Sequence, residues 1–272
     1  MRPDPWEASF QPDPAEPLGF ECRPISAEGV LTGLRLHSFH LSSRGDRVFG
    51  RLRLPAAESG PFPLVLLEHG AGGAKDAPYL DATAARWVNA GAAVASIDLP
   101  LHGERKSPKM SELLLGALRE PSSLDRMRET LLVDFVRQAV VDLRRSLDAL
   151  LAHPEIDAER TVFAGFSLGA IVGATFCAFD RRPRAAALAL AGGGTGPTAA
   201  DPVQFIERCK ETALLFIGAN SDETIPRTAT EALFNAAPEP KELLWFDGTH
   251  GQLPGVALKA MWEFLQRHLA SR

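Results

Sequence analysis

Short apolar segments alternate along this chain with longer segments of helical periodicity, and this alternation constrains the fold most. The runs PLVLLEHG at 63–70 and AAVASIDLP at 92–100 are nearly continuous in apolar residues and are bounded by proline or glycine. Such runs are typical of strands buried on both faces of a sheet. Between them, PYLDATAARWVNAG at 78–91 has helical spacing and ends at a glycine, a common helix C-cap.

The same alternation continues to the end of the chain. Further strands are expected at 161–166, 185–192, 213–219 and 242–248. Further helices are expected at 124–153, 167–180, 227–237 and 255–271. Two β-rich segments at 34–42 and 47–55 flank a turn-like SRGD and indicate an antiparallel hairpin. We therefore expect an α/β fold, with about eight mainly parallel strands opened by the hairpin and helices on both faces.

The chain is expected to form one domain preceded by an arm. Residues 1–30 are proline-rich and acidic, and they should either lie on the domain or stay mobile. Residues 31–272 form the domain, within which 103–125 is a small helical insertion near the rim of the sheet.

Composition narrows the classes of partner. A net charge of −5 argues against nucleic acid or an anionic membrane as the principal partner. Cys22, Cys177 and Cys209 are widely spaced, which indicates reduced thiols and neither a disulfide framework nor a zinc site. The first residues lack a secretory h-region, and no stretch reaches the roughly 18 apolar residues that span a bilayer. We expect a soluble, cytoplasmic protein that uses no metal or cofactor. Its oligomeric state is left open, and a homo-oligomer is possible.

Ser167 lies in AGFSLGA, where the strand at 161–166 should meet a helix. Ligands bind beyond the carboxyl ends of the strands in sheets of this kind, so Ser167 is expected at the functional edge. Small residues at both second neighbours, Gly165 and Gly169, suit a sharp strand-to-helix turn that exposes a nucleophilic serine. The alternative is a glycine-rich turn with a capping serine.

A serine hydroxyl needs a base to take its proton, and His250 is the favoured candidate. It follows the last predicted strand, in a loop at the same sheet edge. His69 and His102 also lie at that edge and are competitors, although each is followed by glycine in a loop with another use. The remaining histidines fall in predicted strands or at helix positions, namely His37, His40, His153 and His268.

A carboxylate should hold the base in its working tautomer. Asp222 follows the strand at 213–219, and the order Ser167, Asp222, His250 is that expected for such a site. Asp247, three residues before His250, is the alternative, and Glu223 is a weaker one.

Acyl transfer also needs donors for a developing oxyanion. The backbone N–H of Leu168 should be one donor. The second should come from HGAGG at 69–73, with Ala71 favoured and Gly72 as its rival, while His69 pins this loop through hydrogen bonds.

With these residues assigned, the chain resembles the α/β-hydrolase superfamily, closest to its dienelactone-hydrolase and acetyl-esterase-like branch. The resemblance spans roughly residues 35–270. It is carried in order by FGRLRLP (49–55), EHGAGGAKDAPYL (68–80), IDLPLHGER (97–105), AGFSLGA (164–170), GANSDETIP (218–226) and DGTHG (247–251).

This resemblance implies a nucleophile, base and acid partner at Ser167, His250 and Asp222. It also yields substrate-pocket candidates, namely His69, Gly70, Gly72, Tyr79 and His102. Dienelactone hydrolases proper carry a cysteine nucleophile, so serine here favours ordinary esters. The large cap of many relatives is missing, since only 192–210 separates the strands at 185–191 and 213–218. We expect a fairly open pocket for small-to-medium acyl groups.

The sequence thus predicts a carboxylesterase-type serine hydrolase acting on a small-molecule ester through an acyl-enzyme. A thioester or lactone hydrolase, or an acyltransferase, could use the same triad and is the alternative within enzymes. Outside enzymes, the alternative is a family member that binds a ligand without turnover.

Overall fold

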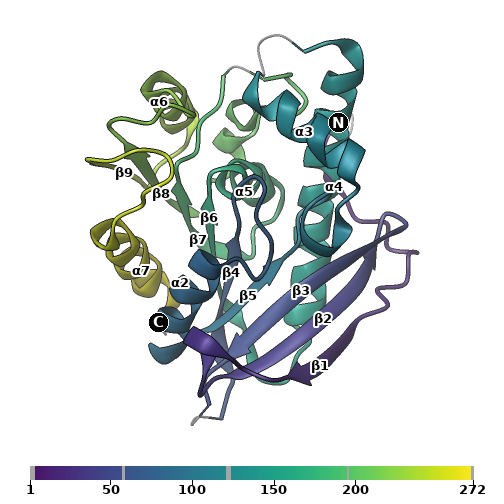
Figure 1. Ribbon diagram of the computed structural model, residues 1–272, viewed down its shortest axis with the longest axis vertical. Coiled ribbons are helices and arrows are strands. Elements are labelled where there is room, and N and C mark those ends of the chain that lie inside the picture. Colours follow the sequence, from purple (N-terminus) through teal and green to yellow (C-terminus); the bar gives the residue numbers. More distant parts are fainter. Residues whose placement is uncertain (1–3, 57–58, 121–123, 195, 271–272) are drawn as a thin grey trace.

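A single mixed sheet forms the centre of the computed structural model, which describes residues 4–56, 59–120, 124–194 and 196–270 (Figure 1). Its strands are β1 (Glu21–Ile25), β2 (Arg35–Ser43), β3 (Asp46–Leu54), β4 (Phe62–Glu68), β5 (Ala93–Ile97), β6 (Ile156–Phe166), β7 (Pro183–Ala189), β8 (Ala213–Ala219) and β9 (Lys241–Phe246). Their order is β1-β2-β3-β5-β4-β6-β7-β8-β9. Pairing is antiparallel from β1 to β5 and parallel from β5 to β9. The expected α/β fold with an opening hairpin is confirmed, with β1 as an additional edge strand.

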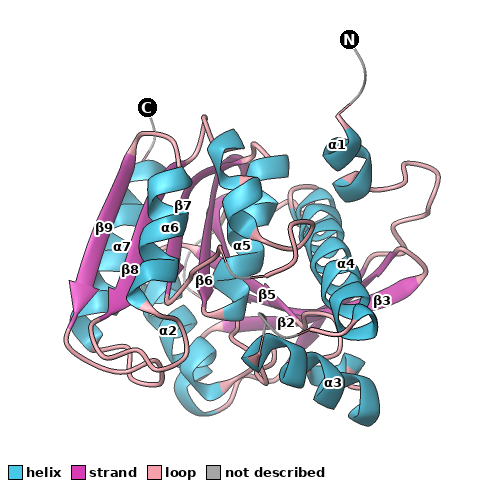
Figure 2. Cartoon of the chain, turned by 90° about the horizontal axis from the view of Figure 1, so that it is seen from above, coloured by secondary structure: helices cyan, strands magenta, loops and turns pink. Residues whose placement is uncertain are grey.

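Helices cover both faces of this sheet (Figure 2). They are α1 (Pro5–Phe10), α2 (Pro78–Asn89), α3 (Pro108–Arg119), α4 (Arg126–Leu150), α5 (Leu168–Phe179), α6 (Arg227–Ala236) and α7 (Gly255–Leu269). Successive side chains of a strand point to opposite faces. Leu64 and Leu66 of β4 therefore pack with α4 and α5, whereas Val65 and Leu67 pack with α2 and α7. The continuous apolar runs of the sequence follow from this double coverage.

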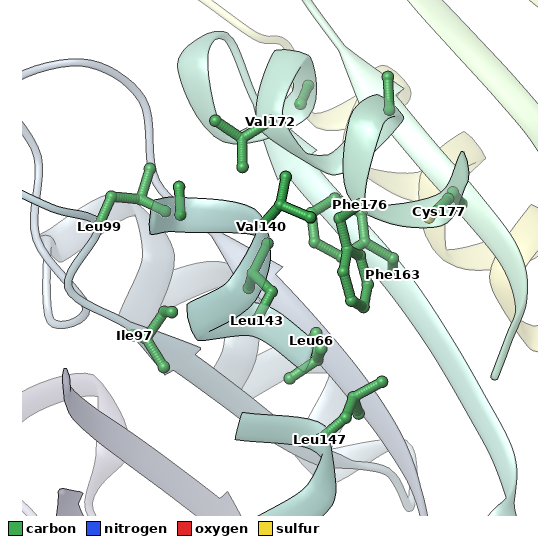
Figure 3. Close-up of a cluster of buried hydrophobic side chains, with 14 of the residues drawn as sticks. Leu66, Ile97, Leu99, Val140, Leu143, Leu147, Phe163, Val172, Phe176 and Cys177 are labelled. Atoms are coloured by element: carbon green, nitrogen blue, oxygen red, sulfur yellow. The ribbon is translucent and has the colours of Figure 1, made fainter. Parts of the chain in front are cut away.

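The face covered by α4 and α5 forms the larger core cluster (Figure 3). Leu66 and Phe163 from the sheet meet Leu143 of α4 and Phe176 of α5, all fully buried. Cys177 packs in the same cluster, and burial raises the pKa of its thiol well above the ordinary value. The packed cluster gives α5 a rigid base at the point where the chain turns from β6 into the helix.

The described part of the arm lies on the domain. Phe10 is buried, with its ring centroid 4.4 Å from that of Phe179 and 5.5 Å from that of Phe205. Arg145 of α4 donates to three backbone carbonyls of the arm, those of Asp13, Glu16 and Pro17. Residues 1–3 of the arm lie outside the described residues. The arm thus packs along α4 before it adds β1 to the sheet.

The helical insertion expected at 103–125 contains a 3-10 turn, η2 (Gly103–Arg105), and α3. Ser111 of α3 donates its hydroxyl proton to the Leu101 carbonyl at 2.7 Å, and Leu114 is buried in the larger cluster. Residues 121–123 of the insertion lie outside the described residues. In the described ranges, every helix is too short or too polar to cross a membrane.

Candidate active site

Ser167 occupies a strained turn between β6 and α5. Its φ is 52°, in the region that L-residues rarely adopt, and its N–H donates to the Ala189 carbonyl at 2.8 Å. A Cβ at Gly165 would lie 2.7 Å from the Ala170 nitrogen, and one at Gly169 would lie 2.6 Å from the His69 carbonyl oxygen. Backbone atoms occupy both places, so only glycine fits on either side of this serine.

The structure brings Ser167, His250 and Asp222 together in one hydrogen-bonded chain. His250 Nε2 is 2.8 Å from Ser167 Oγ, and His250 Nδ1 is 2.8 Å and 3.0 Å from the two carboxylate oxygens of Asp222. Asp222 can only accept, so Nδ1–H donates to it and Nε2 is left to accept the serine proton. The three residues come from the ends of β6, β9 and β8, as parallel strands deliver them to one edge.

Asp222 is also held by its own loop. Its Oδ1 accepts from the backbone N–H groups of Thr224 at 2.8 Å and Ile225 at 2.7 Å, and its side chain is only 4% exposed. The two alternative carboxylates lie elsewhere. Asp247 accepts from the Asn220 amide at 2.6 Å, and Glu223 is exposed. The loop after β8 therefore presents one oriented carboxylate to the imidazole.

His69 and His102 are buried beneath the loop that follows β4. The Nδ1–H of His69 donates to the Gly70 carbonyl at 2.8 Å, and its Nε2 accepts from the Leu99 N–H at 3.2 Å. Burial lowers the pKa of His69 to about 4, so its ring is neutral at pH 7. His102 donates from Nδ1 to the Pro100 carbonyl, and its ring lies 5.1 Å from that of His69. Both histidines were expected among the pocket residues. Their rings are buried and do not line an open pocket, and their hydrogen bonds hold the loop in place.

Residues 70–73 form a tight turn that faces Ser167. The N–H of Gly73 donates to the Gly70 carbonyl at 3.0 Å, and Gly72 has a φ of +77°. A positive φ at the third position is the signature of a type II turn and favours glycine. Within the described residues, the N–H groups of Ala71 and Leu168 make no hydrogen bond. Both remain free to donate to a bound oxygen.

A buried polar network fixes the far end of this turn. Arg53 of β3, fully buried, donates to Asp81 of α2, to Ser96 of β5 and to the Lys75 carbonyl. Sequence reasoning missed this network. The sequence holds one indication of it. Arg51 and Arg53 in RLRLP lie at alternate positions of a predicted strand, where residues that face the interior are expected to be apolar.

Tyr79 lies in the first turn of α2, directly after this loop. Its hydroxyl oxygen accepts from the Gly70 N–H at 2.8 Å, and the residue is 44% exposed. Of the five pocket candidates, Gly70, Gly72 and Tyr79 therefore lie on the side of the loop that faces the solvent or Ser167. Across the described ranges, no group of three His, Cys, Asp or Glu residues could hold a metal ion.

Comparison with known proteins gives matches in family and fold. The model of the alpha/beta hydrolase family matches residues 64–272. An acetyl xylan esterase from Paenibacillus sp. R4 superposes with a TM-score of 0.80 at 20% identity, over 97% of this chain and 93% of that one. A cold-adapted esterase from an Arctic intertidal metagenomic library gives 0.73 at 24% identity, over 88% and 96%. A Klebsiella pneumoniae protein assigned as a dienelactone hydrolase gives 0.63 at 16% identity, over 93% and 99%.

No curated protein matches the chain in sequence. The structural likenesses lie below 25% identity and so establish the fold alone. The family model, by contrast, matches well over half of the sequence, including every residue of the hydrogen-bonded chain described above. The protein is therefore a member of the alpha/beta hydrolase family.

Proposed function

We propose that this protein is a serine carboxylic-ester hydrolase with Ser167 as nucleophile, His250 as general base and Asp222 as its acid partner. The observation that carries the proposal is the continuous hydrogen-bonded chain from Ser167 Oγ through both imidazole nitrogens to Asp222. The free N–H groups of Ala71 and Leu168 on the neighbouring turns support the same assignment.

In the acylation half of the reaction, Ser167 Oγ attacks the ester carbonyl carbon while its proton passes to His250 Nε2. The Asp222 carboxylate stabilises the imidazolium that forms. The carbonyl oxygen becomes an oxyanion and accepts hydrogen bonds from Ala71 and Leu168. When the tetrahedral intermediate collapses, the C–O bond to the alcohol breaks, and His250 returns the proton to the departing alkoxide.

The acyl group is then bound to Ser167 as an ester. A water molecule gives one proton to His250 and attacks the acyl carbon, forming a second oxyanion at the same donors. Collapse breaks the bond to Ser167 Oγ, which regains its proton from His250, and the carboxylic acid leaves. The cycle needs no group beyond those described.

The connections above the site support a small-to-medium acyl group. Between β7 and β8 the chain forms only two short 3-10 turns, η3 (Pro202–Gln204) and η4 (Ile206–Arg208), in its described part. The other candidate covering element is α3, whose Leu114 is buried in the same core cluster as α4. We expect acetyl and butyryl esters to be better substrates than decanoyl esters.

The test is hydrolysis of p-nitrophenyl esters from acetyl to decanoyl by the wild type and by Ser167→Ala. We expect turnover that falls with chain length and a loss of at least about 10⁴-fold in the variant. Ser38→Ala, on β2 and separated from β6 by three strands, is the matched control and should keep full activity. Equal turnover in wild type and Ser167→Ala would refute the assignment of the nucleophile.

A further inference from the structure

Tyr79 is the only tyrosine in the chain, and its hydroxyl lies beside the turn that carries Ala71. The hydroxyl accepts the Gly70 N–H, and Gly70 directly precedes Ala71. The ring is fixed from behind, since its centroid lies 5.6 Å from that of Phe166 in an edge-to-face contact. The phenol is thus held between Gly70 of the loop after β4 and Phe166, which directly precedes the nucleophile.

The same hydroxyl borders the space next to Ser167. A Cβ at Gly70 would lie 3.4 Å from Ser167 Cβ and 3.8 Å from Tyr79 Oη. Ser167 Cβ and Tyr79 Oη therefore both lie within 4 Å of one point, so the distance between them is less than the sum of these two distances. Gly70 has no side chain that would occupy this point between Ser167 and Tyr79.

The phenolic proton is available for that space. A phenol has one donor proton and can also accept, and the Gly70 N–H uses only the accepting capacity. Within the described residues, Tyr79 Oη donates to no acceptor. Accepting from Gly70 also polarises the O–H bond and strengthens it as a donor.

Building on the esterase function proposed above, we propose that Tyr79 is a further catalytic residue, whose hydroxyl donates a third hydrogen bond to the substrate oxyanion. It acts beside the N–H groups of Ala71 and Leu168. No proton is transferred: the O–H stays intact and its hydrogen bond shortens as charge develops on the carbonyl oxygen. The proximity of Gly70 to Ala71 favours the oxyanion over the leaving alcohol as the acceptor.

The ionisable groups around the phenol keep it protonated at neutral pH. Burial raises the pKa of Tyr79, the Gly70 N–H lowers it, and charge on Glu68 of β4 raises it further. Asp81, two residues along α2, is neutralised by Arg51 and Arg53 of β3. His250, the remaining ionisable group of the site, bonds to Ser167 and Asp222.

Ionisation of the phenol distinguishes a structural role of Tyr79, accepting from the Gly70 N–H, from a catalytic role, donating to the substrate. The bond from Gly70 needs only a lone pair, so a phenolate would still hold the turn. Donation to substrate needs the proton and ends when the phenol ionises. Loss of activity at alkaline pH therefore reports the catalytic role and leaves the structural one unchanged.

The single tyrosine makes a direct experiment feasible. Protein produced with 3-fluorotyrosine, a more acidic phenol, carries the label at position 79 alone. We expect the alkaline limb of kcat/KM for p-nitrophenyl acetate to move to lower pH in the labelled enzyme, while the acidic limb stays in place. Tyr79→Phe produced in the same medium contains no label and should lack this limb. Tryptophan fluorescence at each pH verifies that the protein is folded.

The size of the loss of kcat/KM in Tyr79→Phe, and its dependence on the leaving group, show whether Tyr79 donates to the oxyanion or to the leaving alcohol. Tyr79→Phe should lower kcat/KM by about 10-fold or more at neutral pH. The factor should be the same for p-nitrophenyl acetate and ethyl acetate, because the oxyanion forms with either leaving group. A loss confined to ethyl acetate would overturn the oxyanion assignment, and an unmoved alkaline limb would overturn the catalytic role. Wild-type protein without esterase activity would instead remove the proposed function itself.

Discussion

Asp98 holds Lys75 at two points, since its Oδ1 accepts from the Lys75 backbone N–H at 2.8 Å and its Oδ2 from the ammonium at 3.0 Å. Oδ2 also accepts from the Glu104 N–H at 2.9 Å. The carboxylate is fully buried at the end of β5. It therefore connects the loop after β4, two residues beyond the turn that carries Ala71, to the first turn of the helical insertion.

Asp98→Asn should weaken both stability and turnover. Burial alone would lower the pKa of Lys75, but hydrogen bonds to Glu104 and Asp98 outweigh it and raise the pKa. Without the charge of Asp98, a nearly buried ammonium loses its fully buried partner, at a cost of about 3 kcal/mol. Urea unfolding and kcat/KM measure the two effects.

Glu104→Gln is the matched control for Asp98→Asn. Glu104 contacts the same ammonium at 2.6 Å, but its side chain is 57% exposed. Solvent screens such a pair, so this variant should lose no more than about 1 kcal/mol. Equal losses in the two variants would contradict the special role of the buried carboxylate.

Gly169→Ala should abolish turnover and lower the melting temperature. The added Cβ would meet the backbone of Glu68 and His69 at 2.6–2.8 Å, and that backbone cannot shift without disturbing the end of β4. Gly116→Ala provides the opposite case within α3, where a Cβ meets nothing within 4 Å. Because alanine favours the helix, this control should gain about 0.5–1 kcal/mol. Thermal unfolding of both variants, with the ester assay, checks the contrast.

Most of the sheet could be predicted because its strands are buried on both faces. The segment at 213–219 matches β8 residue for residue, since nothing polar interrupts it. β1 could not be predicted in this way. It contains Pro24, four of its five residues are exposed, and it pairs only with β2. An edge strand tolerates proline and needs no apolar face, so neither usual signal was present.

For the site, residue types and chain order predicted which side chains the structure brings together. The order of the strands delivers Ser167, Asp222 and His250 to one edge, and motifs encode that order. Contacts such as Tyr79 with Gly70, or Arg53 with Asp81, depend on how α2 packs against β3 and β4. Neither periodicity nor a short motif carries such information.

Phe10→Ala should release the arm from the domain. The ring is 2% exposed between Phe179 and Phe205, and its removal leaves a cavity costing about 3 kcal/mol. We expect faster proteolysis within the first 20 residues and a lower unfolding midpoint in urea. Val30→Ala, at a position that is 62% exposed, should change neither measurement. An unchanged proteolysis rate in Phe10→Ala would show that other contacts hold the arm.

Glu68→Gln should change how stability depends on pH. Burial raises the pKa of Glu68 well above its ordinary value of 4.5, and within the described residues its Oε2 has no hydrogen-bond partner. Between 4.5 and the folded-state pKa, the folded protein keeps a proton that the unfolded chain has released. The stability due to this group is therefore complete below pH 4.5 and is lost as pH rises through the folded-state pKa.

Glutamine keeps the shape of the protonated acid and cannot ionise, so Glu68→Gln should gain on the wild type as pH rises. The difference in free energy of unfolding should grow by up to about 1.4 kcal/mol per pH unit across this window. Urea unfolding of both proteins from pH 5 to pH 8 measures it. Glu263→Gln on α7, with a 57% exposed side chain, should run parallel to the wild type. Parallel curves for Glu68→Gln as well would mean that the buried carboxyl ionises in the folded protein as it does in the unfolded chain.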